Sequence, residues 1–149
     1  MTPSIVNSPD QEAPARPTPG TRILIVEDNP TNARLSSEML TSAGYVVSVV
    51  ASGEEGLRVV QQLAPALAIL DLQMPGMDGL TLARHLKGDP ATASIPLIVL
   101  TAHAMNEHRK QAMQAGCSAF LTKPVRYRVL LDEVAQVLQS SALTGGPQQ

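Results

Sequence analysis

Five short apolar runs, each followed by a longer segment with helical patterning, restrict most strongly what this chain can fold into. The runs are ILIV (23–26), YVVSVV (45–50), LAIL (67–70), IPLIVL (95–100) and AFLT (119–122). Strands that are apolar on both faces belong in a sheet that is covered on both sides. Such a sheet is built from parallel strands joined by helical crossovers, so we predict an α/β fold with five parallel strands.

The segments between the runs carry the start and stop signals of helices. Asn29 and Pro30 suit the N-cap and the first helical position, and Gly44 suits the end of the same helix. Ser52, followed three residues later by Glu55, has the spacing of a capping box. The last segment places four aliphatic residues on one helix face: Leu130, Val134, Val137 and Leu138. These patterns predict a doubly wound, flavodoxin-like (βα)5 domain with strand order 2-1-3-4-5.

The two ends of the chain differ in composition from the part between them. Residues 1–20 contain five of the 12 prolines and few large apolar side chains, so we predict a disordered tail. Residues 141–149 contain two glycines and a proline without an apolar period, and we expect a flexible tail there as well. The predicted folded domain therefore covers residues 21–140.

Composition narrows the classes of partner. A net charge of -2 and a pI near 5.9 argue against nucleic acid or an anionic membrane as a direct partner. The single cysteine, Cys117, excludes an internal disulfide and fits a reducing compartment. There is no apolar run of transmembrane length and no apolar segment typical of a signal peptide, so we expect a cytoplasmic protein.

Polar side chains follow four of the five predicted strands at the point where each strand ends. Glu27 and Asp28 follow the first strand, Asp71 the third, Thr101 the fourth and Lys123 the fifth. The carboxyl ends of parallel strands lie at one edge of the sheet, where ligands bind in folds of this kind. We therefore expect three carboxylates, a hydroxyl and an ammonium group to converge there.

Three carboxylates in one crevice repel one another unless a cation lies between them. Hard oxygen ligands of this kind suit Mg²⁺, which leaves coordination positions for phosphate oxygens. A divalent ion beside a carboxylate, a hydroxyl and a lysine is the equipment of phosphoryl transfer. Asp71, at the end of a buried strand, is then the candidate nucleophile that would form an aspartyl phosphate.

Four segments together resemble the receiver domain of two-component response regulators: ILIVEDNPTN, LAILDLQMPGMDG, VLTAHA and FLTKPV. They occur in the family's order and at its spacing, and the resemblance covers about residues 21–139. It implies that Asp71 accepts a phosphoryl group from a phosphohistidine on a sensor histidine kinase or a histidine phosphotransfer protein. It also implies that Asp28 and Asp71 bind Mg²⁺ directly, Glu27 through water, and Gln73 through its backbone carbonyl.

The resemblance assigns further roles around the same site. Thr101 and Lys123 would hold the phosphoryl oxygens, and the bond before Pro124 would be cis. Phe120 stands where the family often has a switch tyrosine, so a switch here would work by ring packing alone. Because no DNA-binding or catalytic segment follows residue 140, we expect a protein contact as output, including a phosphorylation-linked dimer. The expected chemistry is limited to the chain's own phosphorylation and dephosphorylation.

Two other classes of protein remain as alternatives. A metal-dependent phosphatase also uses an aspartyl nucleophile, but it would be expected to carry a second carboxylate two residues later, where this chain has Gln73. Turnover of a small phosphorylated substrate would distinguish it. A flavodoxin-like module that binds a nucleotide or flavin is disfavoured because no glycine-rich loop follows the first strand. Tight binding of such a ligand would favour it again.

Overall fold

The structure is a computed structural model that describes residues 20–102 and 105–145. These residues form one sheet with the strands β2 (Arg22–Val26), β3 (Val46–Val50), β4 (Leu67–Leu70), β5 (Leu97–Thr101) and β6 (Ala119–Thr122). All neighbouring strands are parallel, and their order is β3-β2-β4-β5-β6. Counted along the chain, this is the predicted order 2-1-3-4-5.

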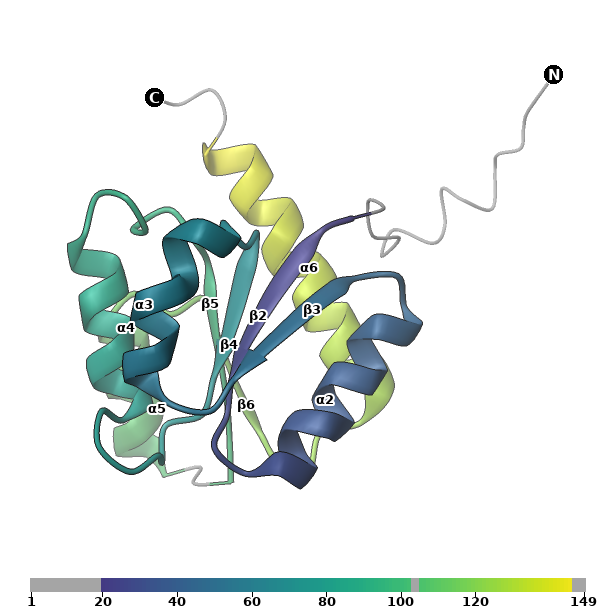
Figure 1. Cartoon of the computed structure of the whole chain (residues 1–149), viewed down its shortest axis with the longest axis horizontal. Helices are drawn as coiled ribbons and strands as arrows, with labels where there is room; N and C mark the ends of the chain where they lie inside the picture. The colour runs from purple at the N-terminus through teal and green to yellow at the C-terminus, as the bar shows by residue number, and fades with distance from the viewer. Residues whose placement is uncertain (1–19, 103–104, 146–149) are drawn as a thin grey trace, which may run out of the picture.

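Helices cover both faces of the sheet (Figure 1). They are α2 (Pro30–Ser42), α3 (Gly53–Leu63), α4 (Gly79–Gly88), α5 (Asn106–Gln114) and α6 (Tyr127–Gly145). Helices α2 and α6 lie on one face, and α3, α4 and α5 lie on the other. The predicted doubly wound α/β architecture is therefore confirmed.

The two faces of the sheet have separate apolar cores, which explains why the strands are apolar throughout. Within β2, Leu24 and Val26 join the cluster under α3, α4 and α5, whereas Ile23 and Ile25 join the cluster under α2 and α6. All four side chains are almost completely buried. A strand that packs on both sides has no position for an exposed polar residue, so the alternation of a half-buried strand is absent.

The predicted helix caps are present. The Asn29 side chain accepts a hydrogen bond from the Asn32 N–H at 3.0 Å, and Ser52 Oγ accepts one from the Glu55 N–H at 3.1 Å. The Glu55 carboxylate accepts the N–H of Ala51 instead of closing the capping box on Ser52 itself. Gly44, just past α2, has a φ of 104°, which favours glycine at the end of a helix.

The last helix runs past the end that the sequence predicts for the folded domain. Helix α6 continues to Gly145, five residues beyond the domain end expected at residue 140. The apolar period that marks the buried face ends at Leu138, but a helix extends as long as its backbone hydrogen bonds form, with or without a buried face. Residues 1–19 and 146–149, which include most of the predicted tails, lie outside the described residues.

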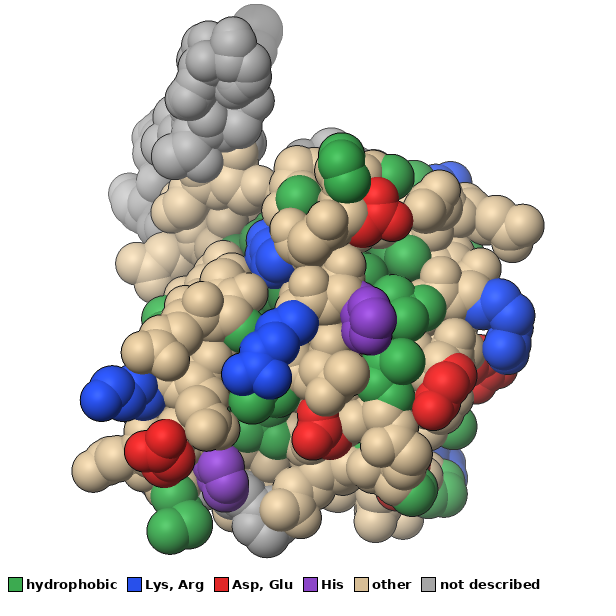
Figure 2. All heavy atoms as spheres, turned by 90° about the vertical axis from the view of Figure 1, so that its left-hand side faces the viewer, with side chains coloured by type: hydrophobic (Ala, Val, Ile, Leu, Met, Phe, Trp, Pro, Cys, Tyr) green, Lys and Arg blue, Asp and Glu red, His purple; other side chains and the backbone are tan. Residues whose placement is uncertain are grey.

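The surface of the described domain is mixed in character. On the side that faces left in Figure 1, acidic and basic side chains are interspersed, with hydrophobic side chains between them (Figure 2). Among the helices of residues 20–102 and 105–145, none has the length and hydrophobicity needed to cross a bilayer.

Candidate functional site

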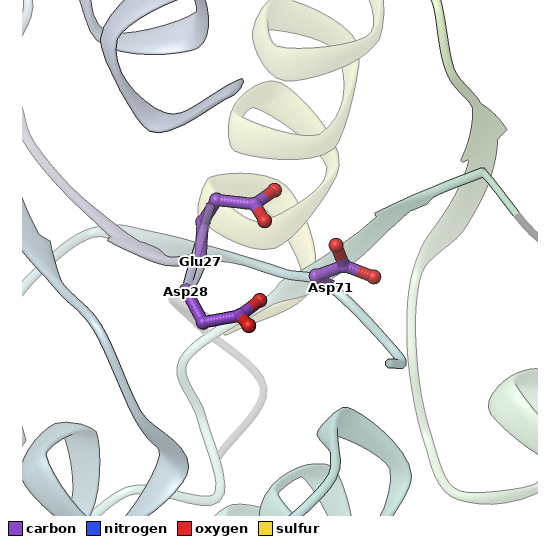
Figure 3. A group of neighbouring side chains, drawn as sticks. All are labelled: Glu27, Asp28 and Asp71. Atoms are coloured by element: carbon purple, nitrogen blue, oxygen red, sulfur yellow. The ribbon is translucent and has the colours of Figure 1, made fainter. Parts of the chain in front are cut away.

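Three carboxylates converge at the carboxyl edge of the sheet. Glu27 and Asp28 follow β2, and Asp71 follows β4, the strand that pairs with β2 through Val26 and Leu70. Each of the three residues offers one carboxylate oxygen, and these oxygens all lie within 4.8 Å of one another (Figure 3). Because Val26 pairs with Leu70, the ends of β2 and β4 lie side by side. This pairing brings Asp71 close to Glu27 and Asp28, which precede it by 44 and 43 residues.

Lys123 connects two of these carboxylates. It follows β6, and its Nζ lies 2.8 Å from Asp71 Oδ2 and also donates a hydrogen bond to Glu27 Oε1. Its backbone N–H donates to the carbonyl oxygen of Thr101 at 2.8 Å. The peptide bond between Lys123 and Pro124 is cis, as the resemblance implied. The ammonium group thus offsets part of the negative charge that the sheet edge collects.

The charges at this site shift one another's pKa values. Burial by itself would raise the pKa of Asp71. The hydrogen bonds from Lys123 and from the backbone N–H of Gln73 outweigh burial and hold this pKa below its ordinary value. Burial raises the pKa of Glu27 above its ordinary value in spite of its hydrogen bond to Lys123. Burial lowers the pKa of Lys123, but its two carboxylate partners leave it raised. Asp71 is therefore ionised at neutral pH, the form that a nucleophile requires.

The loop after Asp71 is held close to its carboxylate. The Gln73 N–H donates to Asp71 Oδ1 at 3.0 Å, and the Gly79 N–H donates to the carbonyl of Leu72 at 3.1 Å. Gly76 adopts a φ of 75°, a backbone conformation that favours glycine. The structure thus places Gln73 beside Asp71 through the backbone N–H of Gln73. The metal contact expected of the Gln73 backbone carbonyl stays a prediction.

Thr101 lies at the same edge of the sheet. It is the last residue of β5, is fully buried, and pairs with Thr122 of β6. Its backbone carbonyl holds the Lys123 N–H, so the two residues that would contact phosphoryl oxygens are joined directly. The structure therefore brings together all six residues that the sequence assigned to the site: Glu27, Asp28, Asp71, Gln73, Thr101 and Lys123.

Two contacts near the site were missed by the sequence analysis. The Arg109 guanidinium lies 4.7 Å from the centre of the Phe120 ring, and Glu54 accepts a hydrogen bond from the Met77 N–H at 3.2 Å. Glu54 and Met77 are 23 residues apart. A carboxylate in the first turn of a helix signals only a favourable position near the helix N-terminus, so no sequence pattern pairs it with a distant amide.

The sequence profile of the response regulator receiver domain matches residues 23–135. This chain belongs to the receiver domain family. Receiver domains act in two-component signalling through phosphorylation, between sensor histidine kinases and downstream targets.

Two curated relatives differ in how much of their length the receiver domain spans. The response regulator PleD of Caulobacter vibrioides is 38% identical over 128 residues, which cover 77% of this chain but only 28% of PleD. The polar-differentiation response regulator DivK of Brucella ovis is 32% identical over 116 residues, which cover 78% of this chain and 94% of DivK. The chain thus spans about a quarter of PleD and nearly all of DivK.

A solved relative bears on the acidic cluster. The receiver domain of the sensor histidine kinase PA1611 from Pseudomonas aeruginosa is 32% identical, with a TM-score of 0.75 over 80% of this chain and 98% of its own. It is described with a magnesium ion coordinated in its active site cleft. In the chain described here, the cluster of Glu27, Asp28 and Asp71 has the ligand type and spacing to hold a metal ion.

Proposed function

We propose that Asp71 of this receiver domain accepts the phosphoryl group of a phosphohistidine. The ion pair of Asp71 and Lys123 is the observation that carries the proposal. An ionised carboxylate oxygen attacks the phosphorus, the bond between phosphorus and the imidazole nitrogen breaks, and the imidazole leaves with the bonding electrons. The Lys123 ammonium lies 2.8 Å from Asp71 Oδ2. When this contact breaks, the ammonium is positioned to donate a hydrogen bond to a phosphoryl oxygen instead.

The acidic cluster fits a divalent cation. Asp28 and Asp71 would bind Mg²⁺ directly, Glu27 would bind it through water, and Gln73 would contribute its backbone carbonyl. When bound, the ion offsets the charge of the carboxylates and of the incoming phosphate. Lys123 already offsets part of the charge on Glu27 and Asp71, whereas Asp28 is exposed to solvent and accessible to an ion.

A cleft beside Lys123 supports docking of the phosphohistidine donor. It has a volume of about 320 Å³ and is lined by apolar side chains of α2 and of the segment after β6, among them Leu35, Met39, Pro124 and Val125. Leu35 is 51% exposed, which is a large fraction for a leucine next to a reactive site. We assign this cleft to a helix of a sensor histidine kinase or a histidine phosphotransfer protein.

The signal would leave through a change of the protein-binding face made by α5, β6 and α6. Phosphorylation would draw Thr101 toward the phosphate, and the ring of Phe120, paired with Val99 two residues before Thr101, would follow. The output would be contact with a downstream protein or a second copy of this chain, in the cytoplasm. The chemistry of the chain would be confined to its own phosphorylation and dephosphorylation.

Labelling by acetyl phosphate, followed by intact-mass spectrometry, tests the phosphorylation site. We expect one phosphoryl group on the wild type with Mg²⁺ and none with EDTA or in Asp71→Asn. Asp78→Asn is the control, because Asp78 lies in the same loop but caps α4. Equal labelling of Asp71→Asn would rule out the assignment. Turnover of p-nitrophenyl phosphate would instead favour a phosphatase.

A matched pair of variants tests the donor cleft. Leu35 and Val46 are each 51% exposed, but Val46 lies on the edge strand β3, away from the cleft. Leu35→Glu should slow transfer from a phosphorylated histidine phosphotransfer protein and leave labelling by acetyl phosphate unchanged. Val46→Glu should leave both rates unchanged. Equal effects of the two variants on transfer would contradict the proposed docking surface.

A further inference from the structure

Glu54 joins helix α3 to the loop that follows Asp71. Its Oε2 accepts a hydrogen bond from the backbone N–H of Met77 at 3.2 Å. Glu54 lies in the first turn of α3, and Met77 lies near the end of the loop that leads into α4. The bond therefore fixes the backbone of this loop from a different element of the fold.

Two glycines allow the loop and the start of α3 to approach each other. A β-carbon on Gly76, which has a φ of 75°, would lie 3.0 Å from Glu54 Oε2. A β-carbon on Gly53 would lie 3.0 Å from the carbonyl oxygen of Met77. Both distances are shorter than ordinary contacts of a β-carbon, so the absence of a side chain on each side permits the approach.

The loop between Gln73 and Asp78 is otherwise held at its two ends. At its start, the Gln73 N–H donates to Asp71 Oδ1, and at its end the Asp78 carboxylate accepts the Thr81 N–H at 2.8 Å. Glu54 supplies an additional hydrogen bond between these ends, at Met77. Gln73 and Met77 belong to the same loop, so the backbone conformation of this loop sets the direction of the Gln73 carbonyl.

We propose that Glu54 is a positioning residue for the metal and phosphoryl site. It acts through the Met77 amide by holding the loop in the conformation that presents the Gln73 carbonyl to the ion. This inference rests on the proposed function, which assigns that carbonyl to Mg²⁺. The Gln73 carbonyl is a backbone group, so the Gln73 side chain cannot orient it toward the ion. Its position has to come from contacts that hold the loop, such as the hydrogen bond of Glu54 to Met77.

Glu55 provides a matched control within the same helix turn. Its carboxylate accepts the N–H of Ala51 at 3.1 Å and is not hydrogen-bonded to the loop. Glu54 and Glu55 carry the same charge near the same helix N-terminus, so a general effect of charge or of helix stability would be similar for both. Glu54→Gln separates charge from geometry, because an amide oxygen still accepts the Met77 N–H.

The experiment is a Mg²⁺ titration of the wild type, Glu54→Ala, Glu54→Gln and Glu55→Ala, followed by amide chemical shifts in NMR spectra. We expect Glu54→Ala to weaken Mg²⁺ binding about three- to tenfold, the factor that one ordinary hydrogen bond supplies. Glu54→Gln and Glu55→Ala should stay within about twofold of the wild type. In metal-free protein, the Met77 amide should exchange with solvent faster in Glu54→Ala alone. Thermal melts verify that every variant is folded.

Several outcomes would overturn the role of Glu54. If Glu54→Gln binds Mg²⁺ as weakly as Glu54→Ala, the effect comes from charge, and if Glu55→Ala matches Glu54→Ala, it comes from the helix. Unchanged Mg²⁺ binding in Glu54→Ala would also overturn it. These results would leave the proposed function intact. By contrast, Mg²⁺ binding that survives Asp28→Asn and Asp71→Asn unchanged would overturn the proposed function and this proposal with it.

Discussion

Gly79 packs so tightly against Asp71 that a β-carbon on Gly79 would lie 2.2 Å from the Asp71 carbonyl oxygen. Gly79 is the first residue of α4, and its N–H donates to the carbonyl of Leu72. The start of this helix therefore lies directly against the backbone that carries the candidate phosphorylation site. The glycine that ends MPGMDG is required by this approach.

Gly79→Ala should destabilise the protein by about 1–3 kcal/mol, because the added methyl group has to displace the Asp71 backbone. The same shift should slow labelling by acetyl phosphate. Urea denaturation and intact-mass spectrometry measure the two effects. Gly88→Ala, at the other end of α4, is the control, because its added β-carbon would meet nothing within 4 Å apart from its chain neighbours and the backbone of its own helix. It should be neutral or stabilising by up to about 1 kcal/mol, and an equal loss in both variants would contradict the explanation.

Asp28→Asn should stabilise the metal-free protein while weakening the binding of Mg²⁺. Asp28 adds negative charge beside Glu27 and Asp71, and its removal relieves repulsion worth up to about 1 kcal/mol for an exposed group. Chemical denaturation in EDTA and in excess Mg²⁺ measures both effects. The wild type should gain stability from Mg²⁺ by mass action, and the variant should gain much less. A variant that is clearly less stable in EDTA would indicate a structural role for Asp28.

The stability contributed by Cys117 should fall in alkaline solution. Burial raises the pKa of this thiol from 9.0 to about 11, in spite of the opposing charge of Lys87. Because the folded state favours the protonated thiol, the contribution is complete below the unfolded pKa and is lost as the pH rises through the folded pKa. The excess stability of the wild type over Cys117→Ala should shrink by about 2 kcal/mol between about pH 8.5 and 10.5. A constant difference across this range would contradict the prediction.

The contact between Arg109 and Phe120 should appear as a coupling energy. A guanidinium over an aromatic ring at an exposed position contributes about 0.5–1 kcal/mol. A double-mutant cycle with Arg109→Ala and Phe120→Leu measures it from unfolding free energies. Lys110→Ala, an exposed neighbour on α5, is the control and should show no coupling to Phe120. Coupling of equal size for Lys110 would show that the effect is not specific to the ring contact.

The sequence by itself determined the architecture and predicted which polar residues gather at the carboxyl edge of the sheet. Apolar runs such as LAIL (67–70) are buried on both faces, so their composition alone predicts a covered parallel sheet. Parallel strands place their carboxyl ends at one edge, and this geometric rule is enough to bring Asp71 and Lys123 together. Helix caps such as Asn29 and Ser52 are local, so they too can be read from the residues nearby.

Only the tertiary structure decided which groups at the site contact one another. The sequence placed three carboxylates near Lys123, but the folded chain pairs the ammonium with Glu27 and Asp71 and leaves Asp28 exposed. The bond of Glu54 to Met77 and the approach of Gly79 to Asp71 were equally hidden. Whether such contacts form depends on differences of a few tenths of an ångström in the separation of elements that are remote in sequence. The packing of the whole domain sets these separations.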